Sequence, residues 1–284
     1  MRVIPVAFDS FGARSMATFV STKGTKIMID PSVALGPRRY GLPPHEKEIR
    51  RKEKLWERIK RYAEKADVIV VTHYHYDHHN PHEVEVYRDK VVLIKDPKNK
   101  INRSQMGRSS FFLSQIEGVA REIIIADERE FEFEGVAVRF SKPVPHGTND
   151  RLGYVLEVLV EEKKRFLFTS DVEGLSLDEQ LNEAIKFDPD IVFADGPMTY
   201  MLNYRFSQKS LERSIENLSL LMEKTGVKKL VIDHHLTRDI KWRERVERVF
   251  ERGKDFGVKV LSAAEFAGVK EDLLEARRKE LYES

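Results

Sequence analysis

The sequence predicts an α/β fold in which two sheets are covered by helices. Three observations support this class: strand-like apolar runs occur in both halves of the 284-residue chain, helical patterns lie between them, and hydrophobic residues make up 41% of the chain, enough for a sizeable core. No Pro/Ser-rich linker, low-complexity tract or short repeat interrupts it. We therefore expect residues 1–284 to form a single domain.

The first half is expected to alternate short strands with one long helix. An apolar stripe in a charged segment, residues 44–65, predicts a surface helix within a helical insertion of residues 43–66. The stripe consists of Ile49, Leu55, Trp56, Ile59 and Tyr62. The run DVIVVT (Asp67–Thr72) is typical of a central strand. The other expected strands are Val3–Phe8, Met16–Ser21, Lys26–Ile29, Val91–Ile94, Glu122–Ile125, Val136–Phe140, Gly153–Val160 and Arg165–Thr169.

Helical patterns dominate the second half. The expected helices are Leu177–Phe187, Ser207–Thr225, Ile240–Phe256 and Lys270–Tyr282. Two buried-type strands, Asp190–Ala194 and Lys229–Ile232, separate them. The last segment, residues 270–284, mixes charges of both signs and is read as a C-terminal helix with a solvated face.

The composition of the chain excludes several classes of function. Lys and Arg (49) nearly balance Asp and Glu (47), a net charge of +2 that argues against a dedicated nucleic-acid binder but leaves room for basic patches. With no cysteine, zinc fingers, iron–sulfur sites and Cys nucleophiles are excluded, so any metal must be held by His, Asp and Glu. The polar N-terminus and the lack of a membrane-length apolar run predict a cytoplasmic protein without membrane partners, and the charged composition fits a thermophile.

Five of the nine histidines lie within ten residues, in the sequence THYHYDHHNPH directly after the strand DVIVVT. His73 and His75 are two residues apart on an extended segment, so their side chains can converge on one ion. Asp77 and His78 follow where the chain can curl and offer ligands to a second ion. Imidazole and carboxylate are the ligands that zinc accepts in the absence of thiolates. This cluster therefore predicts a metal site.

The motif His73-x-His75-x-Asp77-His78 resembles the signature of the metallo-β-lactamase fold superfamily. The match continues in order with a histidine in PVPHGTND, an aspartate at the end of FLFTSD and a histidine in LVIDHHLTRD. The segments SFGARSMATFV and IDPSVALGPRRYGLPPH further resemble an archaeal family of predicted metal-dependent hydrolases. The resemblance spans roughly residues 3–238. One departure is Asn80, which stands where many members of the superfamily have glycine.

The resemblance implies a four-layer αβ/βα sandwich, with two mixed sheets flanked by helices and the site at the sheet edge. It also implies two divalent ions, zinc first, with manganese or iron as alternatives. The implied ligands are His73, His75 and His146 for the first ion and Asp77, His78 and His234 for the second, with Asp171 between the two.

Two neighbouring histidines leave the last ligand open. His234 is preferred over His235 because the sequence from it resembles the His-x-x-x-Arg ending of the tRNA-processing branch of the superfamily, which places Arg238 at the arginine of that motif. Arg238 and His235 are then candidates for contacting substrate. Asp195 closes the strand DIVFA, so we expect it to hydrogen-bond a ligand histidine or to cap a turn.

A dinuclear site predicts a hydrolase that attacks with a metal-bridged hydroxide, with Asp77 as the catalytic group that orients it. The first hypothesis is a phosphodiester substrate, RNA or a nucleotide, supported by Arg238 and by a basic loop, Lys95–Arg108. The alternatives are hydrolysis of a carboxylic ester, lactone, thioester or amide, and a non-catalytic metal-binding regulatory role. The sequence leaves the substrate and any homo-oligomer open.

Overall fold

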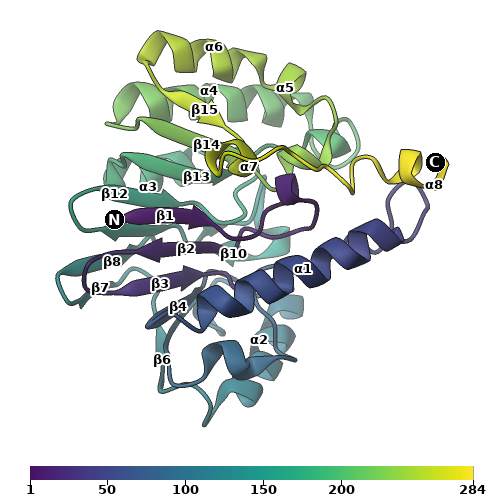
Figure 1. Ribbon diagram of the computed structural model, residues 1–284. Helices are drawn as coiled ribbons and strands as arrows, with labels where there is room; N and C mark the ends of the chain where they lie inside the picture. The colour runs from purple at the N-terminus through teal and green to yellow at the C-terminus, as the bar shows by residue number, and fades with distance from the viewer. Residues whose placement is uncertain (284) are drawn as a thin grey trace.

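The computed structural model describes residues 1–283 and contains two large mixed sheets (Figure 1). The first has six strands in the order β1-β2-β3-β4-β5-β6. Its strands are β1 (Arg2–Pro5), β2 (Thr18–Ser21), β3 (Lys26–Ile29), β4 (Val68–Val71), β5 (Val91–Ile94) and β6 (Glu122–Ile125). The pairs β1/β2 and β2/β3 are antiparallel, and the pairs from β3 to β6 are parallel.

The second sheet has seven strands in the order β15-β14-β13-β12-β11-β8-β7, parallel from β12 to β15 and antiparallel elsewhere. Its strands are β7 (Glu130–Phe133), β8 (Val136–Phe140), β11 (Val158–Glu161), β12 (Arg165–Phe168), β13 (Ile191–Asp195), β14 (Lys229–Asp233) and β15 (Lys259–Leu261). A small ribbon of β9 (Val144–Pro145) and β10 (Tyr154–Val155) lies beside it.

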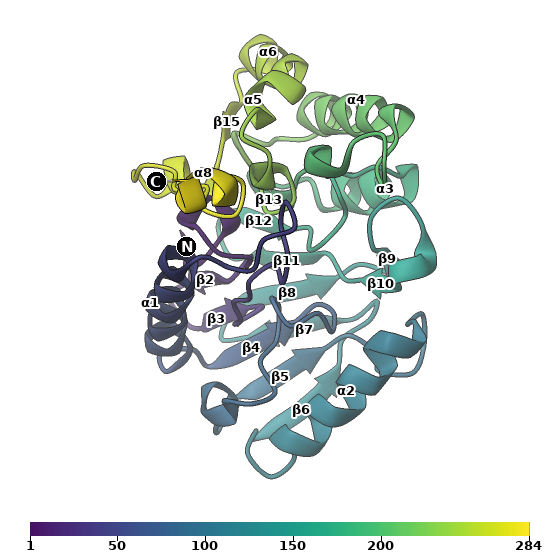
Figure 2. The same ribbon diagram turned by 90° about the vertical axis from the view of Figure 1, so that its right-hand side faces the viewer.

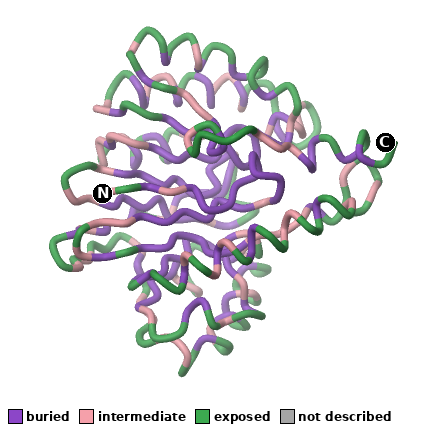
Figure 3. The backbone as a smooth tube through the Cα atoms, in the orientation of Figure 1, coloured by how far each residue is buried: buried purple, intermediate pink, exposed green. Residues whose placement is uncertain are grey.

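Helices cover the sheets on opposite sides. α3, α4 and α6 lie over the second sheet, and α1 and α2 lie on the side of the first (Figures 1 and 2). The helices are α1 (Glu46–Ala63), α2 (Arg103–Ile116), α3 (Asp178–Phe187), α4 (Gln208–Lys224), α5 (Trp242–Arg245), α6 (Glu247–Phe256), α7 (Ala263–Phe266) and α8 (Arg278–Glu283). Figure 3 shows buried backbone concentrated in the sheets and along the inner sides of the helices.

Strand residues alternate between two hydrophobic clusters, which explains why the inner strands are apolar throughout. On β12, Phe166 and Phe168 pack into the cluster shared with the first sheet, whereas Leu167 packs into the cluster beneath α3 and α4. Both faces of β12 are therefore buried. This arrangement of helices, sheet, sheet and helices confirms the four-layer sandwich.

Parallel pairing brings several strand ends to one edge of the molecule. In the first sheet β3 and β4 end side by side, and in the second β12, β13 and β14 do the same, with Asp195 in register with Asp233. The residues that follow these strands form the candidate site.

The expected helix of residues 44–65 is α1, but its stripe begins one residue earlier than predicted. Ile49 is 43% exposed, and Glu48 is fully buried in its place. The Glu48 carboxylate forms an ion pair with Arg278 of α8, 2.8 Å away. This long-range partner makes burial of a carboxylate tolerable.

Two expected elements are interrupted. The predicted strand Gly153–Val160 divides into β10 and β11, which pair with different strands, because the intervening Leu156 donates its N–H to the Thr72 carbonyl across the molecule. The predicted helix Ile240–Phe256 breaks at Val246 into α5 and α6. The strands β7, β9 and β15 have no counterpart among the expected strands.

The predicted helix Lys270–Tyr282 is mostly wrong. Only α8 is helical, residue 284 of the expected 270–284 helix lies outside the described residues, and the chain before α8 runs in turns. We call residues 270–283 the C-terminal segment. Its acidic side chains pair with residues far back in the chain, Asp272 with Arg51 (2.7 Å) and Glu275 with Arg14 (2.5 Å). Within residues 1–283, no helix combines the length and apolar character that crossing a membrane requires.

Candidate metal centre

The structure brings all seven residues predicted as metal ligands together. Four follow β4, and the others follow β9, β12 and β14. The segment after β4 turns at once: the N–H groups of His78 and His79 both donate to the His75 carbonyl. That turn brings Asp77 and His78 back beside the histidines of the strand end.

The first group consists of His73, His75, His146 and Asp171, whose donor atoms all lie within 4.8 Å of one another. Nε2 of His146 lies 3.1 Å from Nδ1 of His75 and 3.1 Å from Oδ2 of Asp171. The same Asp171 oxygen lies 3.5 Å from Nε2 of His73. Three imidazoles and one carboxylate thus face a common centre.

The second group consists of Asp77, His78 and His234, again within 4.8 Å. Nε2 of His234 lies 3.6 Å from Oδ2 of Asp77. Oδ1 of Asp171 lies 3.0 Å from Nε2 of His78 and 3.5 Å from Nε2 of His234. Asp171 therefore directs one carboxylate oxygen towards each group, the placement expected of a residue between two ions.

Polar side chains behind the histidines fix their orientation. Nδ1 of His78 lies 2.7 Å from Oδ2 of Asp30, and Nδ1 of His234 lies 2.7 Å from Oδ2 of Asp9. Nδ1 of His73 lies 3.2 Å from the Ser170 hydroxyl. A hydrogen bond at Nδ1 holds each ring in place and leaves Nε2 free for a metal.

Two residues at the centre adopt left-handed backbone conformations that side chains other than glycine rarely adopt. Ser170, just before Asp171, and His234 both have φ of 57°. Each such residue costs on the order of 1 kcal/mol and persists only where its surroundings hold it. At His234 the Asp233 carboxylate accepts the backbone N–H at 2.7 Å and so stabilises this turn.

Burial and charge shift the pKa values of the cluster in opposite directions. Burial and the charge of His78 lower the pKa of His73 to about 3. Burial lowers the pKa of His78 as well, but the carboxylates of Asp171 and Asp30 outweigh it and raise that pKa to about 10. Burial raises the pKa of Asp171, yet His78 and His234 hold it well below its usual range. At neutral pH His73 is therefore neutral and Asp171 ionised, the forms that bind a cation, whereas His78 carries a proton that it has to release when a metal binds.

The donor set fits a divalent cation. Nε2 of His73, Nε2 of His78 and Oδ1 of Asp171 are buried, and their polar neighbours at 3.0–3.5 Å are other members of the cluster. Buried polar atoms need partners, and these face a common centre. Imidazole and carboxylate are ligands suited to zinc and to other divalent transition metals.

The two neighbouring histidines differ in their surroundings. His234 joins Asp77 and His78, whereas His235 turns towards the cavity, with Nδ1 2.9 Å from the Asp195 carboxylate. Asp195 thus contacts the rival histidine rather than the preferred ligand. His235 still comes within 4.8 Å of Asp171 and His234, so it borders the second group.

Arg238 lies beside the second group and is almost fully buried. Its Nε donates to Oδ1 of Asp9 at 2.7 Å, and one terminal nitrogen lies 3.0 Å from Nε2 of His234 and 3.7 Å from Oδ2 of Asp77. The other terminal nitrogen is 3.4 Å from the Tyr200 hydroxyl. The partner of this guanidinium is therefore Asp9, not the neighbouring Asp239 or a carboxylate of the helix of residues 44–65.

The structure corrects the expectation of a basic loop at Lys95–Arg108. Lys95 is fully buried, pairs with Asp127 at 2.7 Å and donates to two backbone carbonyls. From Arg103 onward the segment is helix α2. Arg108 alone of the segment's basic residues lines the cavity described next, so the loop does not form a phosphate site as a unit.

A cavity of about 900 Å³ opens onto both metal-ligand groups. Its protein wall includes His75, Asp77, His146, Asp171, Glu173, His235, Arg14, Arg108, Arg151, Arg205, Arg238, Tyr76, Tyr200, Tyr204, Met198 and Met201. Three arginines of the wall lie over tyrosine rings: Arg108 over Tyr76, Arg205 over Tyr204 and Arg238 over Tyr200. Cationic and aromatic groups thus surround the centre.

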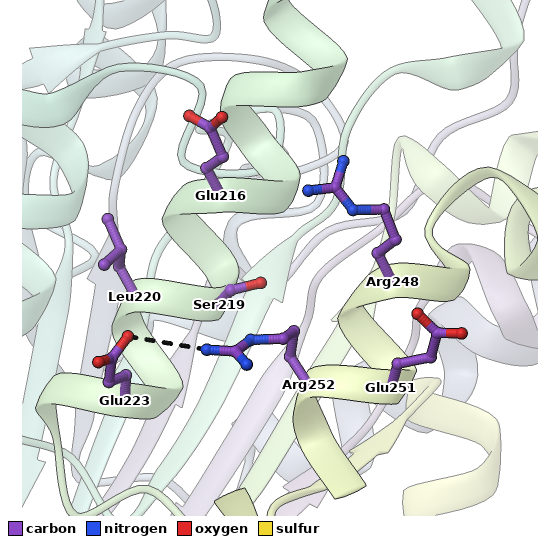
Figure 4. Close-up of a pocket in the computed structure, with 7 residues that line it drawn as sticks. All are labelled: Glu216, Ser219, Leu220, Glu223, Arg248, Glu251 and Arg252. Carbon is purple, nitrogen blue, oxygen red and sulfur yellow. Dashed lines mark ion pairs between the residues drawn. The ribbon is translucent and has the colours of Figure 1, made fainter. Parts of the chain in front are cut away.

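A second hollow, between α4 and α6, offers no comparable chemistry (Figure 4). No histidine lines it. Its acidic and basic side chains face one another across the two helices, as in the ion pair of Glu223 with Arg252 at 3.9 Å. We regard it as a solvated groove between helices.

Sequence reasoning missed several polar residues at the site. Among them, Asp9 and Asp30 contact candidate ligand histidines, and Arg14 and Glu173 line the cavity. The available signal was positional: Asp30 directly follows a strand that runs parallel to β4, so it had to end at the same sheet edge.

Comparisons with known proteins identify the family of the chain. Residues 25–235 match the family model described as beta-lactamase superfamily domain. The UPF0282 protein of Korarchaeum cryptofilum is 56% identical over 285 residues, covering 100% of this chain and 95% of that protein.

Two solved structures share the fold. One is a possible metal-dependent hydrolase from Veillonella parvula (16% identity, TM-score 0.53, 92% of this chain and 94% of that one). The other is an isothiocyanate hydrolase from Delia radicum gut bacteria (18% identity, TM-score 0.56, 88% and 95%). The chain belongs to the beta-lactamase superfamily and, within it, to the family of archaeal UPF0282 proteins.

Proposed function

We propose that this protein is a metal-dependent hydrolase with two divalent ions, zinc being the first metal to test. His73, His75 and His146 would hold one ion, Asp77, His78 and His234 the other, and Asp171 would contact both. The support is the convergence of seven donor side chains, several of them with buried atoms that have no other partner. Bound divalent ions supply Lewis acidity, which lowers the pKa of a water and stabilises developing negative charge.

Asp77 is the proposed catalytic residue. Its carboxylate belongs to the second group and also lines the cavity. A carboxylate in that position accepts a hydrogen bond from an attacking water and orients it towards the substrate. Asp171, in contrast, is almost fully buried and serves the ligand histidines on both sides.

The proposed substrate is a phosphodiester, RNA or a nucleotide, and Arg238 is the observation that carries this choice. Its terminal nitrogen is bonded to Nε2 of His234, the atom proposed as a ligand. If that lone pair were used for coordination, and with Nδ1 of His234 bonded to Asp9, the N–H would be free to bind a phosphate oxygen at the centre. The hydrogen bond from Nε of Arg238 to Asp9 keeps the guanidinium oriented.

A substrate panel tests the proposal. Purified protein loaded with zinc or manganese is assayed on bis(p-nitrophenyl) phosphate, p-nitrophenyl acetate, a lactone and a thioester. We expect turnover of the phosphodiester, lost in His73→Ala. If only the carbonyl substrates react, the hydrolase acts on esters or their relatives. If no substrate reacts although both ions are bound, a regulatory metal-binding role replaces the enzyme.

A further inference from the structure

A second arginine enters the cavity from the opposite end of the chain. Arg14 precedes β2, and its backbone is bridged to Ala34 on the cavity wall. The Glu275 carboxylate of the C-terminal segment accepts both from Nε (2.6 Å) and from one terminal nitrogen (2.5 Å) of Arg14. Among residues 1–283, the remaining terminal nitrogen of Arg14 has no hydrogen-bond acceptor. One edge of the guanidinium is thus fixed, and the other is available to a ligand.

The ion pair of Arg14 with Glu275 is tightly enclosed. A Cβ added at Gly36 would lie 2.4 Å from a terminal nitrogen of Arg14 and 2.7 Å from the Glu275 carboxylate. Real Cβ atoms do not approach so closely, so a side chain at residue 36 would push the ends of Arg14 and Glu275 aside, and glycine leaves room for the pair. The two hydrogen bonds to Glu275 hold the orientation of Arg14.

Arg14 and Arg238 form a matched pair on one cavity. Each has a carboxylate behind it, Glu275 for Arg14 and Asp9 for Arg238. Burial and the positive charge of Arg238 lower the pKa of Arg14, and the bond to Glu275 more than offsets both effects. Two guanidinium groups that face one space repel each other, and an anion between them relieves that repulsion.

Arg14 and Glu275 lie outside residues 25–235, the range that matches the family model, whereas the proposed metal ligands all lie inside it. The pair is therefore separate in sequence from the stretch that carries the proposed ligands.

We propose that Arg14, positioned by Glu275, binds a second phosphoryl group of the substrate while Arg238 contacts the one at the metal centre. This inference rests on the proposed function and narrows its substrate to compounds with at least two phosphoryl groups, such as a nucleotide with a further phosphate. A guanidinium edge with its orientation fixed suits that role because it recognises phosphate oxygens with defined geometry.

Calorimetric titration of the metal-loaded protein with orthophosphate and with pyrophosphate tests the inference, with elemental analysis to verify that the ions stay bound. We expect pyrophosphate to bind about tenfold more tightly, one charge-assisted contact. Arg14→Met, which keeps an apolar stem, should abolish this gain and leave orthophosphate affinity unchanged. Glu275→Gln should remove part of the gain in affinity for pyrophosphate, and Glu275→Asp should restore some of that gain. If Arg14→Met weakens both probes equally, or neither, the inference is wrong.

Arg51→Met is the matched control, because it removes another ion pair of the C-terminal segment, with Asp272, away from the cavity. The pyrophosphate gain should survive; a loss as large as in Glu275→Gln would overturn the positioning role. A further pair of probes is malonate and acetate. If malonate binds more tightly than acetate in an Arg14-dependent way, and pyrophosphate shows no such gain over orthophosphate, the assignment to a phosphoryl group is overturned. Phosphodiester turnover is scored separately, so an Arg14-dependent gain without turnover refutes the proposed function alone.

Discussion

The adjacent residues His234 and His235 can be separated by substitution. Because His234 lies with Asp77 and His78, His234→Ala should remove one of two bound ions. His235→Ala should keep both and change substrate affinity, since His235 contacts Asp195 and the cavity. Elemental analysis after metal loading and gel filtration measures this. The reverse pattern would move the ligand by one residue and remove the argument for Arg238.

A quantitative prediction concerns the substitution of Arg238. Loss of one charge-assisted contact should cost about 1.5–3 kcal/mol, or roughly ten- to a hundredfold in kcat/KM on a phosphodiester. Arg238→Lys should recover only part, because an ammonium lacks the planar fork. Arg245→Ala, which removes an exposed partner of Asp239, is the control and should have no effect. A wild-type rate in Arg238→Ala, combined with lower thermal stability, would show a structural role only.

Glu157 makes stability depend on pH. It is fully buried and neither carboxylate oxygen has a hydrogen-bond partner, and burial raises its pKa well above the usual range. When the pKa of a carboxyl is raised in the folded state, the protein becomes less stable as the pH rises above the pKa of that carboxyl in the unfolded chain, about 4.3. Glu157→Gln should therefore melt higher than wild type at pH 8, with a smaller difference at pH 4. Equal differences at both pH values would contradict this.

At the scale of elements, the ion pair between α1 and α8 should be the main attachment of the C-terminal segment. Glu48 and Arg278 are both fully buried, and Arg278 also donates to the carbonyls of Gly36 and Leu42. Arg278→Ala should lower the free energy of unfolding by about 3–5 kcal/mol, because it leaves a buried carboxylate unpaired. Denaturant unfolding measures this, with Arg277→Ala as the exposed neighbour control. A loss in Arg278→Ala no larger than in the control would refute it.

Elements with a strong local pattern were predictable, and those decided by distant partners were not. The apolar run before His73 predicted β4, and the charged amphipathic pattern of residues 44–65 predicted α1. The C-terminal segment has a helical composition, yet Asp272 and Glu275 pair with residues more than 200 positions away, and these contacts override local preference. No periodicity in the sequence carries that information.

For the whole molecule, the prediction with the widest consequences concerns metal content. The chain should bind up to two divalent ions, and removing them should lower the melting temperature, because ligands that bind only the folded state stabilise it by about 2.7 kcal/mol at a hundredfold excess over Kd. Elemental analysis and thermal melts with and without chelator test this. No metal in the wild type after zinc or manganese loading would defeat the proposed centre.

The site was predictable from sequence as far as its ligands share a compact motif or follow strands in a fixed order. His73 to His78 are adjacent in sequence, and the structure places His146, Asp171 and His234 around them. The outer residues were not predictable, because Asp9 reaches His234 across 225 positions and a lone aspartate after a short strand resembles any turn residue.

The pairing of Arg14 with Glu275 connects residues that are 261 positions apart. All seven proposed metal ligands lie between these two residues, at positions 73 to 234. A cut in the chain between residues 234 and 275 would therefore leave every proposed ligand on one fragment and Glu275 on the other. Proteolysis there would separate the anchoring of Arg14 from the proposed metal centre.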